Sequence, residues 1–171
     1  MQGYIQVYTG DGKGKTTAAL GLALRAAGAG LKVFIAQFAK GMEYSEIKIL
    51  REKLPEITIR QYGQDCFIVN KPTEKDIKLA RQGLKEVREI IRSGKFDVVI
   101  LDEATIAVHF NLFSNDELLD VIRRKPDNLE LIITGRKAHP ELIKAADLVT
   151  EMLEIKHYYQ NGVKARKGIE S

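Results

Sequence analysis

The segment Thr9-Gly-Asp-Gly-Lys-Gly-Lys-Thr-Thr17 constrains the fold of this chain more than any other. It follows a short apolar stretch, Tyr4–Tyr8, that is expected to form a strand. It opens a stretch rich in Ala and Leu, from Lys15 to about Ala29, that is expected to form a helix. A glycine-rich turn between a strand and a helix directs backbone N–H groups and the positive end of the helix toward an anion. The sequence therefore predicts a phosphate-binding loop within an α/β fold.

The end of this loop matches the general pattern G-x-x-x-x-G-K-[ST], but its start does not. Gly14-Lys15-Thr16 fills the end, whereas Thr9 stands where the first glycine belongs. We expect Lys15 to reach phosphate oxygens and the Thr16 hydroxyl to bind Mg²⁺. The residues expected to hold the nucleotide are Gly10, Asp11, Gly12, Lys13, Gly14, Lys15, Thr16 and Thr17. A glycine turn without a ligand is the alternative, and the strand and helix on either side of the loop argue against it.

A second chemical signal comes where a buried strand ends in carboxylates. The run Val98-Val-Ile-Leu101 is apolar on both faces, as in a parallel strand covered by helices, and Asp102 and Glu103 follow it directly. The carboxyl ends of parallel strands meet at one edge of a sheet, where the phosphate loop lies as well. One of the two carboxylates is therefore expected to hold Mg²⁺, directly or through water.

Short apolar runs alternate with longer helical patterns along the whole chain. Further strands are expected at Val33–Phe38, Ile57–Gln61, Phe96–Leu101, Leu129–Thr134 and about Leu148–Leu153. Helices are expected over Ile77–Ile91 after a capping box at Thr73, after a second box at Ser114, and from Pro140. This alternation predicts an α/β fold with a mostly parallel sheet and helices on both faces. Together with the phosphate loop, it leads us to expect the P-loop NTPase (RecA-like) type. We expect one nucleotide-binding domain over residues 1–171, with a basic tail from about residue 156 that is mobile or lies over a site.

The composition excludes several classes of protein. Hydrophobic residues make up 44% and charged residues 29% of the chain, which is typical of a globular domain rather than a disordered one. Cys66 is the only cysteine, so the chain forms no internal disulfide and no cysteine-based zinc site. We find no signal-peptide pattern and no apolar run near the roughly 18 residues of a membrane helix. We therefore expect a cytoplasmic protein without a membrane partner, and the net charge of +4 mildly favours anionic ligands.

Nucleotide binding leaves open what is done with the nucleotide. Hydrolysis that drives a motor or a switch would use Glu103 to activate water. Phosphoryl transfer would need a lid and an acceptor pocket, and attack at the 5′ carbon would release triphosphate. A nucleic-acid ATPase would show a basic stripe interleaved with stacking aromatics, and the sequence has none, so we expect no nucleic-acid partner. A P-loop ATPase or a nucleotide-dependent switch stays open as the alternative function.

Several segments beyond the loop carry a more specific pattern. After Thr9–Gly21 come Gln37-Phe-Ala-Lys-Gly41, Val98–Glu103, Thr134-Gly-Arg136 with His139, Ala146–Glu151, and the tail segments Lys156-His157, Gly162–Ala165 and Gly168-Ile169. In this order they resemble the ATP:corrinoid adenosyltransferases of the P-loop, cobalamin-biosynthetic type, from Tyr4 to Ile169. The tail match is the most specific, because no general rule for phosphate loops asks for it.

The resemblance implies that the Co(I) centre of a reduced corrinoid attacks the 5′ carbon of ATP and that triphosphate leaves. Co(I) is itself a strong nucleophile, so the protein would position the reactants and neutralise the leaving group. Lys13 and Lys15 are the expected catalytic residues. The resemblance further places Gln37, Lys40 and Arg136 near the nucleotide, and Thr16 and Glu103 at Mg²⁺ with Asp102 as the alternate ligand.

The resemblance also implies an aromatic loop after the third strand that covers the corrinoid. Here that region reads Tyr62-Gly63-Gln-Asp-Cys66-Phe67-Ile68, and Tyr62, Gly63 and Phe67 are the candidate corrinoid residues. A flavoprotein reductase that supplies Co(I) is implied by the chemistry, and a homodimer by the resemblance. Some members carry an extension ahead of the first strand, and since this chain starts three residues before Tyr4 we expect none.

Overall fold

The computed structural model describes residues 2–64, 68 and 71–170. In that part of the chain, one sheet has the strand order β3-β2-β4-β5-β1-β6. Its strands are β1 (Ile5–Thr9), β2 (Val33–Phe38), β3 (Ile57–Tyr62), β4 (Val98–Asp102), β5 (Glu130–Thr134) and β6 (Leu148–Glu151). All five neighbouring pairs are parallel. The prediction of an α/β fold with a mostly parallel sheet is therefore confirmed.

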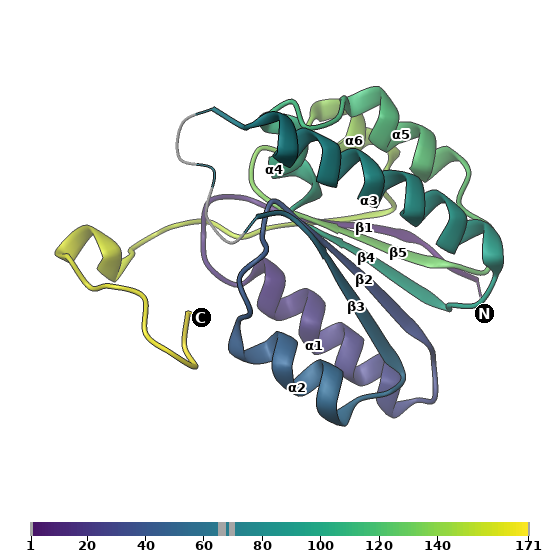
Figure 1. Cartoon of the computed structure of the whole chain (residues 1–171), viewed down its shortest axis with the longest axis horizontal. Helices are drawn as coiled ribbons and strands as arrows, with labels where there is room; N and C mark the ends of the chain where they lie inside the picture. Colours follow the sequence, from purple (N-terminus) through teal and green to yellow (C-terminus); the bar gives the residue numbers. More distant parts are fainter. Residues whose placement is uncertain (1, 65–67, 69–70, 171) are drawn as a thin grey trace.

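Helices cover both faces of this sheet, as Figure 1 shows. They are α1 (Lys15–Gly28), α2 (Ser45–Lys53), α3 (Glu74–Ser93), α4 (Ala104–His109), α5 (Asn115–Arg123), α6 (Pro140–Ala145) and a short 3₁₀ helix, η1 (Tyr158–Asn161). Helices α1 and α2 lie on one face, and α3, α4, α5 and α6 lie on the other. The segment that contains η1 projects from the body of the molecule and then turns back toward the start of α1.

The core has two parts because successive side chains of a strand point to opposite faces of the sheet. Ile35 and Ile100 are buried on the side of α1 and α2, where small residues of α1 such as Ala19 and Ala23 let the helix approach closely. Phe34, Val99 and Leu131 are buried on the other side, under the layer of α3, α4, α5 and α6. The central strands are buried on both faces, which is why they read as continuous apolar runs.

The capping boxes predicted from the sequence form at the starts of α3 and α5. Thr73 and Asp76 form a reciprocal capping box at the start of α3, and Ser114 and Glu117 form a second one at the start of α5. The apolar stripe of α3 faces the sheet, with Ala80, Leu84, Val87 and Ile91 buried. Both predicted capping boxes and the predicted helix that begins at Pro140 are confirmed.

Two short helices were absent from the sequence prediction. Helix α2 has no side-chain cap at its start. Helix α4 begins directly after β4, and Glu103, the residue between them, has a φ of 57°. This left-handed conformation is costly for a residue with a side chain, but it turns the chain from strand to helix within one residue.

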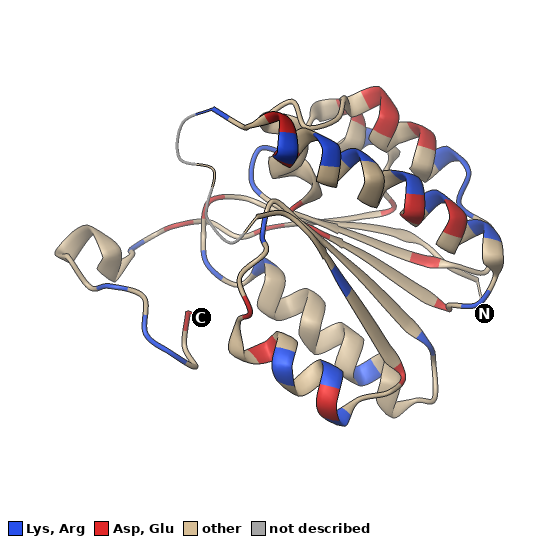
Figure 2. Cartoon of the chain, viewed as in Figure 1, with Lys and Arg blue, Asp and Glu red and all other residues tan. Residues whose placement is uncertain are grey.

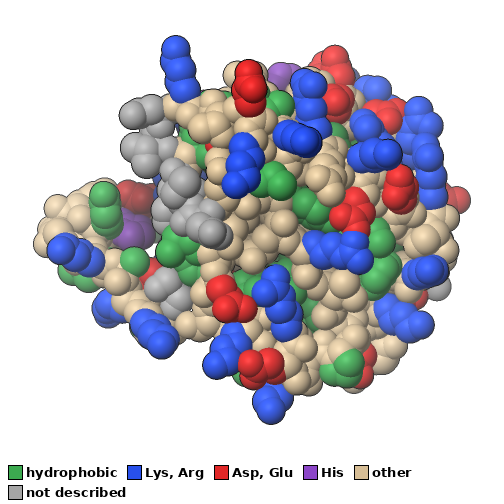
Figure 3. Space-filling model, viewed as in Figure 1, with side chains coloured by type: hydrophobic (Ala, Val, Ile, Leu, Met, Phe, Trp, Pro, Cys, Tyr) green, Lys and Arg blue, Asp and Glu red, His purple; other side chains and the backbone are tan. Residues whose placement is uncertain are grey.

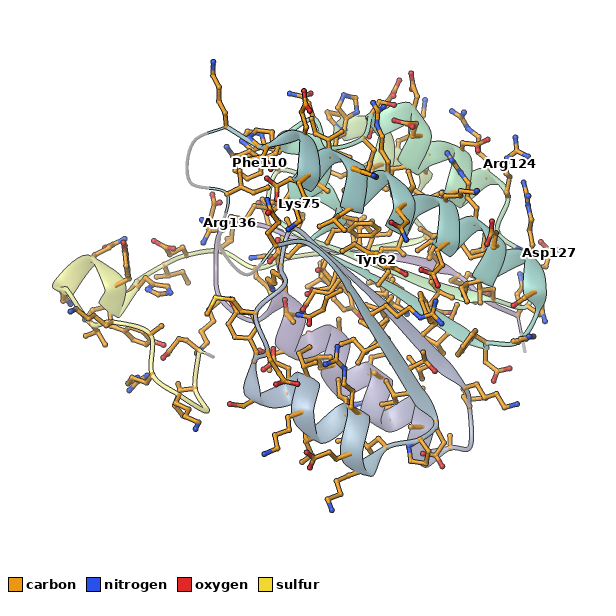
Figure 4. All side chains as sticks on the ribbon, viewed as in Figure 1. Tyr62, Lys75, Phe110, Arg124, Asp127 and Arg136 are labelled. Atoms are coloured by element: carbon orange, nitrogen blue, oxygen red, sulfur yellow. The ribbon has the colours of Figure 1, made fainter. Side chains whose placement is uncertain are left out.

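The topology brings the loops after β1, β2, β3 and β4 to one edge of the sheet, since all strands run in the same direction. Strand β5 lies between β1 and β4, so one strand separates the phosphate loop from the acidic end of β4. Figure 4 shows Arg136 and Phe110 at this edge, and Arg124 and Asp127 at the opposite one. Among the helices that the structure describes, none combines the length and the apolar character needed to cross a bilayer.

Candidate nucleotide site and a second cavity

The phosphate loop packs against the segment that follows β6. Gly12 N–H donates to the Met152 carbonyl at 2.7 Å, and Met152 N–H donates to the Thr9 carbonyl at 2.8 Å. A Cβ atom at Gly10 or Gly12 would come within 2.4 Å or 2.7 Å of the Met152 carbonyl oxygen. The glycines therefore stand at these two positions because neighbouring backbone leaves no space for a side chain, and Gly10 in addition has a φ of 93°.

Thr9 has its own role at the position where the general pattern has a glycine. Its side chain is buried, and its Oγ1 accepts a hydrogen bond from Ala138 N–H at 3.3 Å. The hydroxyl thus fastens the loop after β5 to the phosphate loop. Gly14 precedes α1 with a φ of 125°, a conformation that glycine adopts far more readily than other residues.

Lys15 lies folded across the loop, with its ammonium group on backbone oxygens. Its Nζ donates to the carbonyls of Gly10 and Gly12, both at 2.6 Å. Burial lowers the pKa of Lys15, and the positive charge of Arg136 lowers it further. The negative charge of a phosphate in the loop would offset both effects on the pKa of Lys15. The ammonium group can therefore exchange its carbonyl contacts for phosphate oxygens.

Asp102 is the polar centre of the site and is buried, with 2% of its surface exposed. Its Oδ1 accepts hydrogen bonds from Thr134 Oγ1 at 2.6 Å and from Thr16 Oγ1 at 2.8 Å. Its Oδ2 accepts from Gln37 Nε2 at 2.9 Å. Burial alone would raise the pKa of Asp102, but the attraction of Lys40 and these donated hydrogen bonds outweigh it and hold the pKa below its ordinary value.

Lys40 places a positive charge among the oxygens predicted to bind Mg²⁺. Its Nζ lies 3.4 Å from Asp102 Oδ2, 3.4 Å from Glu103 Oε1 and 3.5 Å from Thr16 Oγ1. Burial lowers the pKa of Lys40, but the two carboxylates outweigh it and raise the pKa above the ordinary value. The structure thus brings the three predicted metal ligands together around one cationic group.

Two cavities open at this edge of the sheet. The first, of about 520 Å³, is formed by the phosphate loop, the start of α2 and the tail; its lining includes Gly12, Lys13, Gly14, Lys15, Thr16, Thr17, Tyr44 and Glu170. The second, of about 380 Å³, lies on the side of α4 and includes Ala39, Ile68, Ile106, His109, Phe110 and Lys137. Lys40, Glu103 and Arg136 line both cavities, so the two adjoin.

Of the remaining predicted nucleotide residues, Arg136 lines the first cavity and Gln37 does not. Arg136 Nε lies 3.9 Å from Asp11 Oδ1, and both side chains are largely exposed beside the loop. Gln37 does not line either cavity; it is buried and holds Asp102 and, through its Oε1, the Gln61 amide at 2.9 Å. Its contribution is therefore to orient Asp102.

The predicted corrinoid residues also differ in whether they face a cavity. Tyr62 is buried; its hydroxyl donates to Glu86 at 2.6 Å, and its ring packs against the α3 backbone at Gly83, so it faces the core rather than either cavity. Gly63 lies against the Lys40 backbone, where a Cβ would come within 2.4 Å of Lys40 N. Phe67 lies outside the described residues, and Ile68 from the same loop lines the second cavity.

The sequence assigns no role to several residues of the site. Thr134 is fully buried and both donates to Asp102 and accepts from Glu103 N–H at 3.1 Å. It belongs to the motif segment Thr134-Gly-Arg136, but the motif does not indicate these contacts. Ile106 and Phe110 reach the second cavity through α4, a helix that the sequence did not predict. Since strands β4 and β5 are neighbours only in space, a sheet topology was needed to find the Thr134 contact.

Comparisons with known proteins agree over nearly the whole length of the chain. The family model for ATP:corrinoid adenosyltransferase BtuR/CobO/CobP matches residues 1–171. A corrinoid adenosyltransferase of Pseudomonas aeruginosa is 34% identical over 170 residues, which cover 99% of this chain and 84% of the relative. A corrinoid adenosyltransferase of Escherichia coli K12 is 35% identical, with 99% and 86% covered. The corrinoid adenosyltransferase CobA of Salmonella typhimurium is 34% identical with the same coverage.

Proposed function

Since this chain belongs to the family of ATP:corrinoid adenosyltransferases, we propose that it transfers the 5′-deoxyadenosyl group of ATP to the Co(I) centre of a reduced corrinoid. In this reaction the cobalt donates an electron pair to the 5′ carbon, and a Co–C bond forms as the C5′–O bond breaks. Triphosphate leaves with the electron pair of the broken bond. The chemistry thus asks the protein to hold two substrates in contact and to stabilise a strongly anionic leaving group.

The observation that carries this proposal is the pair of adjoining cavities. A phosphate loop opens into the first cavity, and the second is lined by Ile68, Ile106 and Phe110. A corrinoid is much larger than 380 Å³, so the second cavity would take one edge of the macrocycle. The shared wall of Lys40, Glu103 and Arg136 is where the 5′ carbon and the cobalt would meet.

Backbone strain supports a functional role for the second cavity. Four residues other than glycine have a positive φ in the described part of the chain, and three of them line this cavity: Ala39, Glu103 and Lys137, with φ of 55°, 57° and 58°. Such conformations cost of order 1 kcal/mol each and gather where a site needs a particular backbone path. Strain concentrated around one small cavity indicates that its shape matters.

Mg²⁺ fits the oxygens around Lys40. Hydroxyl and carboxylate oxygens are the ligands that this hard cation prefers, and a positive group already lies among them. The Thr16 hydroxyl directs its hydrogen to Asp102, which leaves its lone pairs facing Lys40. Thr16 and Glu103 would hold the ion, with Asp102 as the alternate ligand, and the bound ion would neutralise charge on the triphosphate.

The lysines of the loop suit the same leaving group. Lys15 can exchange its two carbonyl contacts for phosphate oxygens, and Lys13 stands at the outer side of the cavity. No general base is required, because the nucleophile is the reduced cobalt of the substrate. A flavoprotein that supplies Co(I), a homodimeric assembly and a cytoplasmic location are parts of the proposal that follow from the chemistry and the family.

An anaerobic absorbance assay tests the reaction. The protein is mixed with MgATP and chemically reduced cobalamin, and the light-sensitive cobalt–carbon product is measured together with free triphosphate. Product and triphosphate in equal amounts are expected. Release of ADP and inorganic phosphate without the cobalt–carbon product would favour the P-loop ATPase, and ATP binding with no chemistry, beside an active relative as positive control, would favour the nucleotide-dependent switch.

A matched pair of variants links the reaction to the two cavities. Phe110→Ala removes an apolar wall of the second cavity, so it is expected to raise KM for the corrinoid and leave ATP binding unchanged. Lys15→Ala is expected to weaken ATP binding about a hundredfold. If Phe110→Ala weakened ATP binding instead, the second cavity would belong to the nucleotide.

A further inference from the structure

We propose that residues 157–170, here termed the tail strap, close the outer side of the nucleotide cavity, and that Glu170 is a positioning residue that holds Lys13 toward the triphosphate. The strap supplies His157, Gly168, Ile169 and Glu170 to the lining of the first cavity. Figure 1 shows it projecting beyond the sheet and turning back toward the start of α1. The inference deepens the proposed function, on which it rests for the identity of the triphosphate.

Lys13 is the point where the strap meets the phosphate loop. Its Nζ donates to Glu170 Oε1 at 3.1 Å, to the Ile169 carbonyl at 3.0 Å and to Tyr158 Oη at 3.3 Å. These contacts join residues 145 to 157 positions apart in the chain. The side chain of Lys13 remains 42% exposed, so without the strap it would be a flexible surface lysine.

The strap has an internal structure that presents Glu170 at this point. Arg166 donates to both oxygens of Glu170, through its backbone N–H at 2.8 Å and its guanidinium at 3.0 Å. The guanidinium also lies over the Tyr158 ring, 5.1 Å from its centroid, and the Tyr158 hydroxyl donates to Glu170. Gly162 and Gly168, with φ of 78° and 77°, make the two turns that bring these groups together.

The strap carries several Lys and Arg side chains, but oxygen atoms make its contacts with Lys13 of the phosphate loop. Figures 2 and 3 show Lys and Arg along the strap, and Figure 2 shows an acidic residue near its end. Arg166 is committed to Glu170 rather than directed into the cavity. The hydrogen bonds to Glu170 and Tyr158 raise the pKa of Lys13, so the lysine stays protonated while it is held.

A count of donors gives the consequence for nucleotide binding. An ammonium group has three N–H donors, and three oxygens of the strap occupy them. A phosphate oxygen at Lys13 must therefore replace at least one strap contact, and Tyr158, at the longest distance, is the first to be given up. The retained ion pair with Glu170 would then limit Lys13 to directions that face the loop.

A double-mutant cycle on the full chain tests this role. MgATP affinity is measured by calorimetry, without corrinoid, for the wild type, Glu170→Gln, Lys13→Met and the double variant. Glu170→Gln is expected to raise the Kd for MgATP about three- to fivefold, the scale of an exposed ion pair, and to have no further effect beside Lys13→Met. Glu170→Asp should recover part of the affinity. In steady state the effect should fall on KM for ATP, with little change in kcat.

Glu154→Gln is the matched control. It removes the same charge from the same region, and Glu154 contacts Gln160 rather than Lys13. An unchanged or tighter Kd in Glu170→Gln, or an equal loss in the Lys13→Met background, would overturn the positioning role. Because the cycle needs no corrinoid, it can succeed or fail independently of adenosyl transfer.

Discussion

Replacing Thr134 by valine would test whether buried hydrogen bonds to Asp102 organise the site. Valine and threonine are both branched at Cβ, so the change replaces the hydroxyl by a methyl group and keeps the shape of the side chain. The hydroxyl makes two contacts: it donates to Asp102 Oδ1 at 2.6 Å and accepts from Glu103 N–H at 3.1 Å. Both Thr134 and Asp102 are buried, so water does not replace what is lost.

The expected loss of stability is about 2–4 kcal/mol. A hydrogen bond to a charged group contributes about 1.5–3 kcal/mol, and a buried N–H left without a partner adds a penalty of about 1 kcal/mol or more. For a domain of this size, such a loss lowers Tm by about 10 °C. Thr134→Ser keeps the hydroxyl and loses only a methyl group, which costs about 1 kcal/mol.

Urea denaturation of the two variants gives a sharp comparison. If burial of apolar surface alone decided stability, the Thr134→Val variant would be more stable than Thr134→Ser. If the hydrogen bonds decide it, Thr134→Ser is the more stable variant. Equal stability, or a more stable valine variant, would refute the reasoning.

The pH dependence gives a second readout of the same variant. The pKa of Asp102 is lower in the folded protein than its ordinary value of 3.8, so the carboxylate contributes stability above that pH and loses it as the pH falls through the folded pKa. Thr134→Val removes one cause of the lowered pKa. It should therefore lose stability at a higher pH than the wild type does during acid titration.

Three other predictions concern the phosphate loop, the predicted corrinoid residues and the core. Lys15→Ala should weaken MgATP binding about a hundredfold, measured by calorimetry, and an unchanged Kd would contradict the assignment of the loop. Phe67→Ala, like Phe110→Ala, should raise KM for the corrinoid while the Kd for ATP stays unchanged; a fall in ATP affinity would assign that loop to the nucleotide. The pKa of Tyr62 is raised to about 12, mainly by burial. In an ultraviolet titration, Tyr62→Phe should therefore remove the tyrosine ionisation that occurs at the highest pH, rather than one near the ordinary value of 10.0. Since the folded pKa is the higher one, this tyrosine contributes stability below pH 10 that is lost as the pH rises toward 12.

The elements with strong local signals were predicted well. Strand β2 has the predicted bounds, and α3 and α5 begin after the predicted capping boxes. Strand β4, predicted over Phe96–Leu101, begins at Val98 and extends one residue further, to Asp102, because Asp102 pairs with Gln37 of β2. Strand β6 ends earlier, at Glu151, because the next residue turns to the phosphate loop. Strand ends therefore depend on partners that lie far away in the sequence.

Part of the arrangement of the predicted site residues follows from the sequence. The loop, Lys40, Glu103 and Arg136 come together at the first cavity, because motif residues follow strands whose ends share one edge. Tyr62 is a predicted corrinoid residue because it stands at the start of the aromatic loop. Successive side chains of a strand point to opposite faces of the sheet, and the side chain of Tyr62, at the end of β3, points to the core. The tail is basic, as expected, but its contacts with Lys13 of the loop are made by oxygen atoms of Tyr158, Ile169 and Glu170.

The two halves of the nucleotide site follow different physical rules. Around Asp102, four donors converge on a buried carboxylate, so the arrangement is fixed by desolvation and by geometry and is little affected by salt. Around Lys13, an ion pair holds an exposed strap to an exposed loop, and salt screens it. A site that must admit ATP and release triphosphate benefits from this division: the half that orients the reacting end stays fixed, while the half that closes the cavity opens at small cost. Raising the salt concentration should therefore abolish the difference in ATP affinity between Glu170→Gln and the wild type, and leave the effect of Thr134→Val on stability in place.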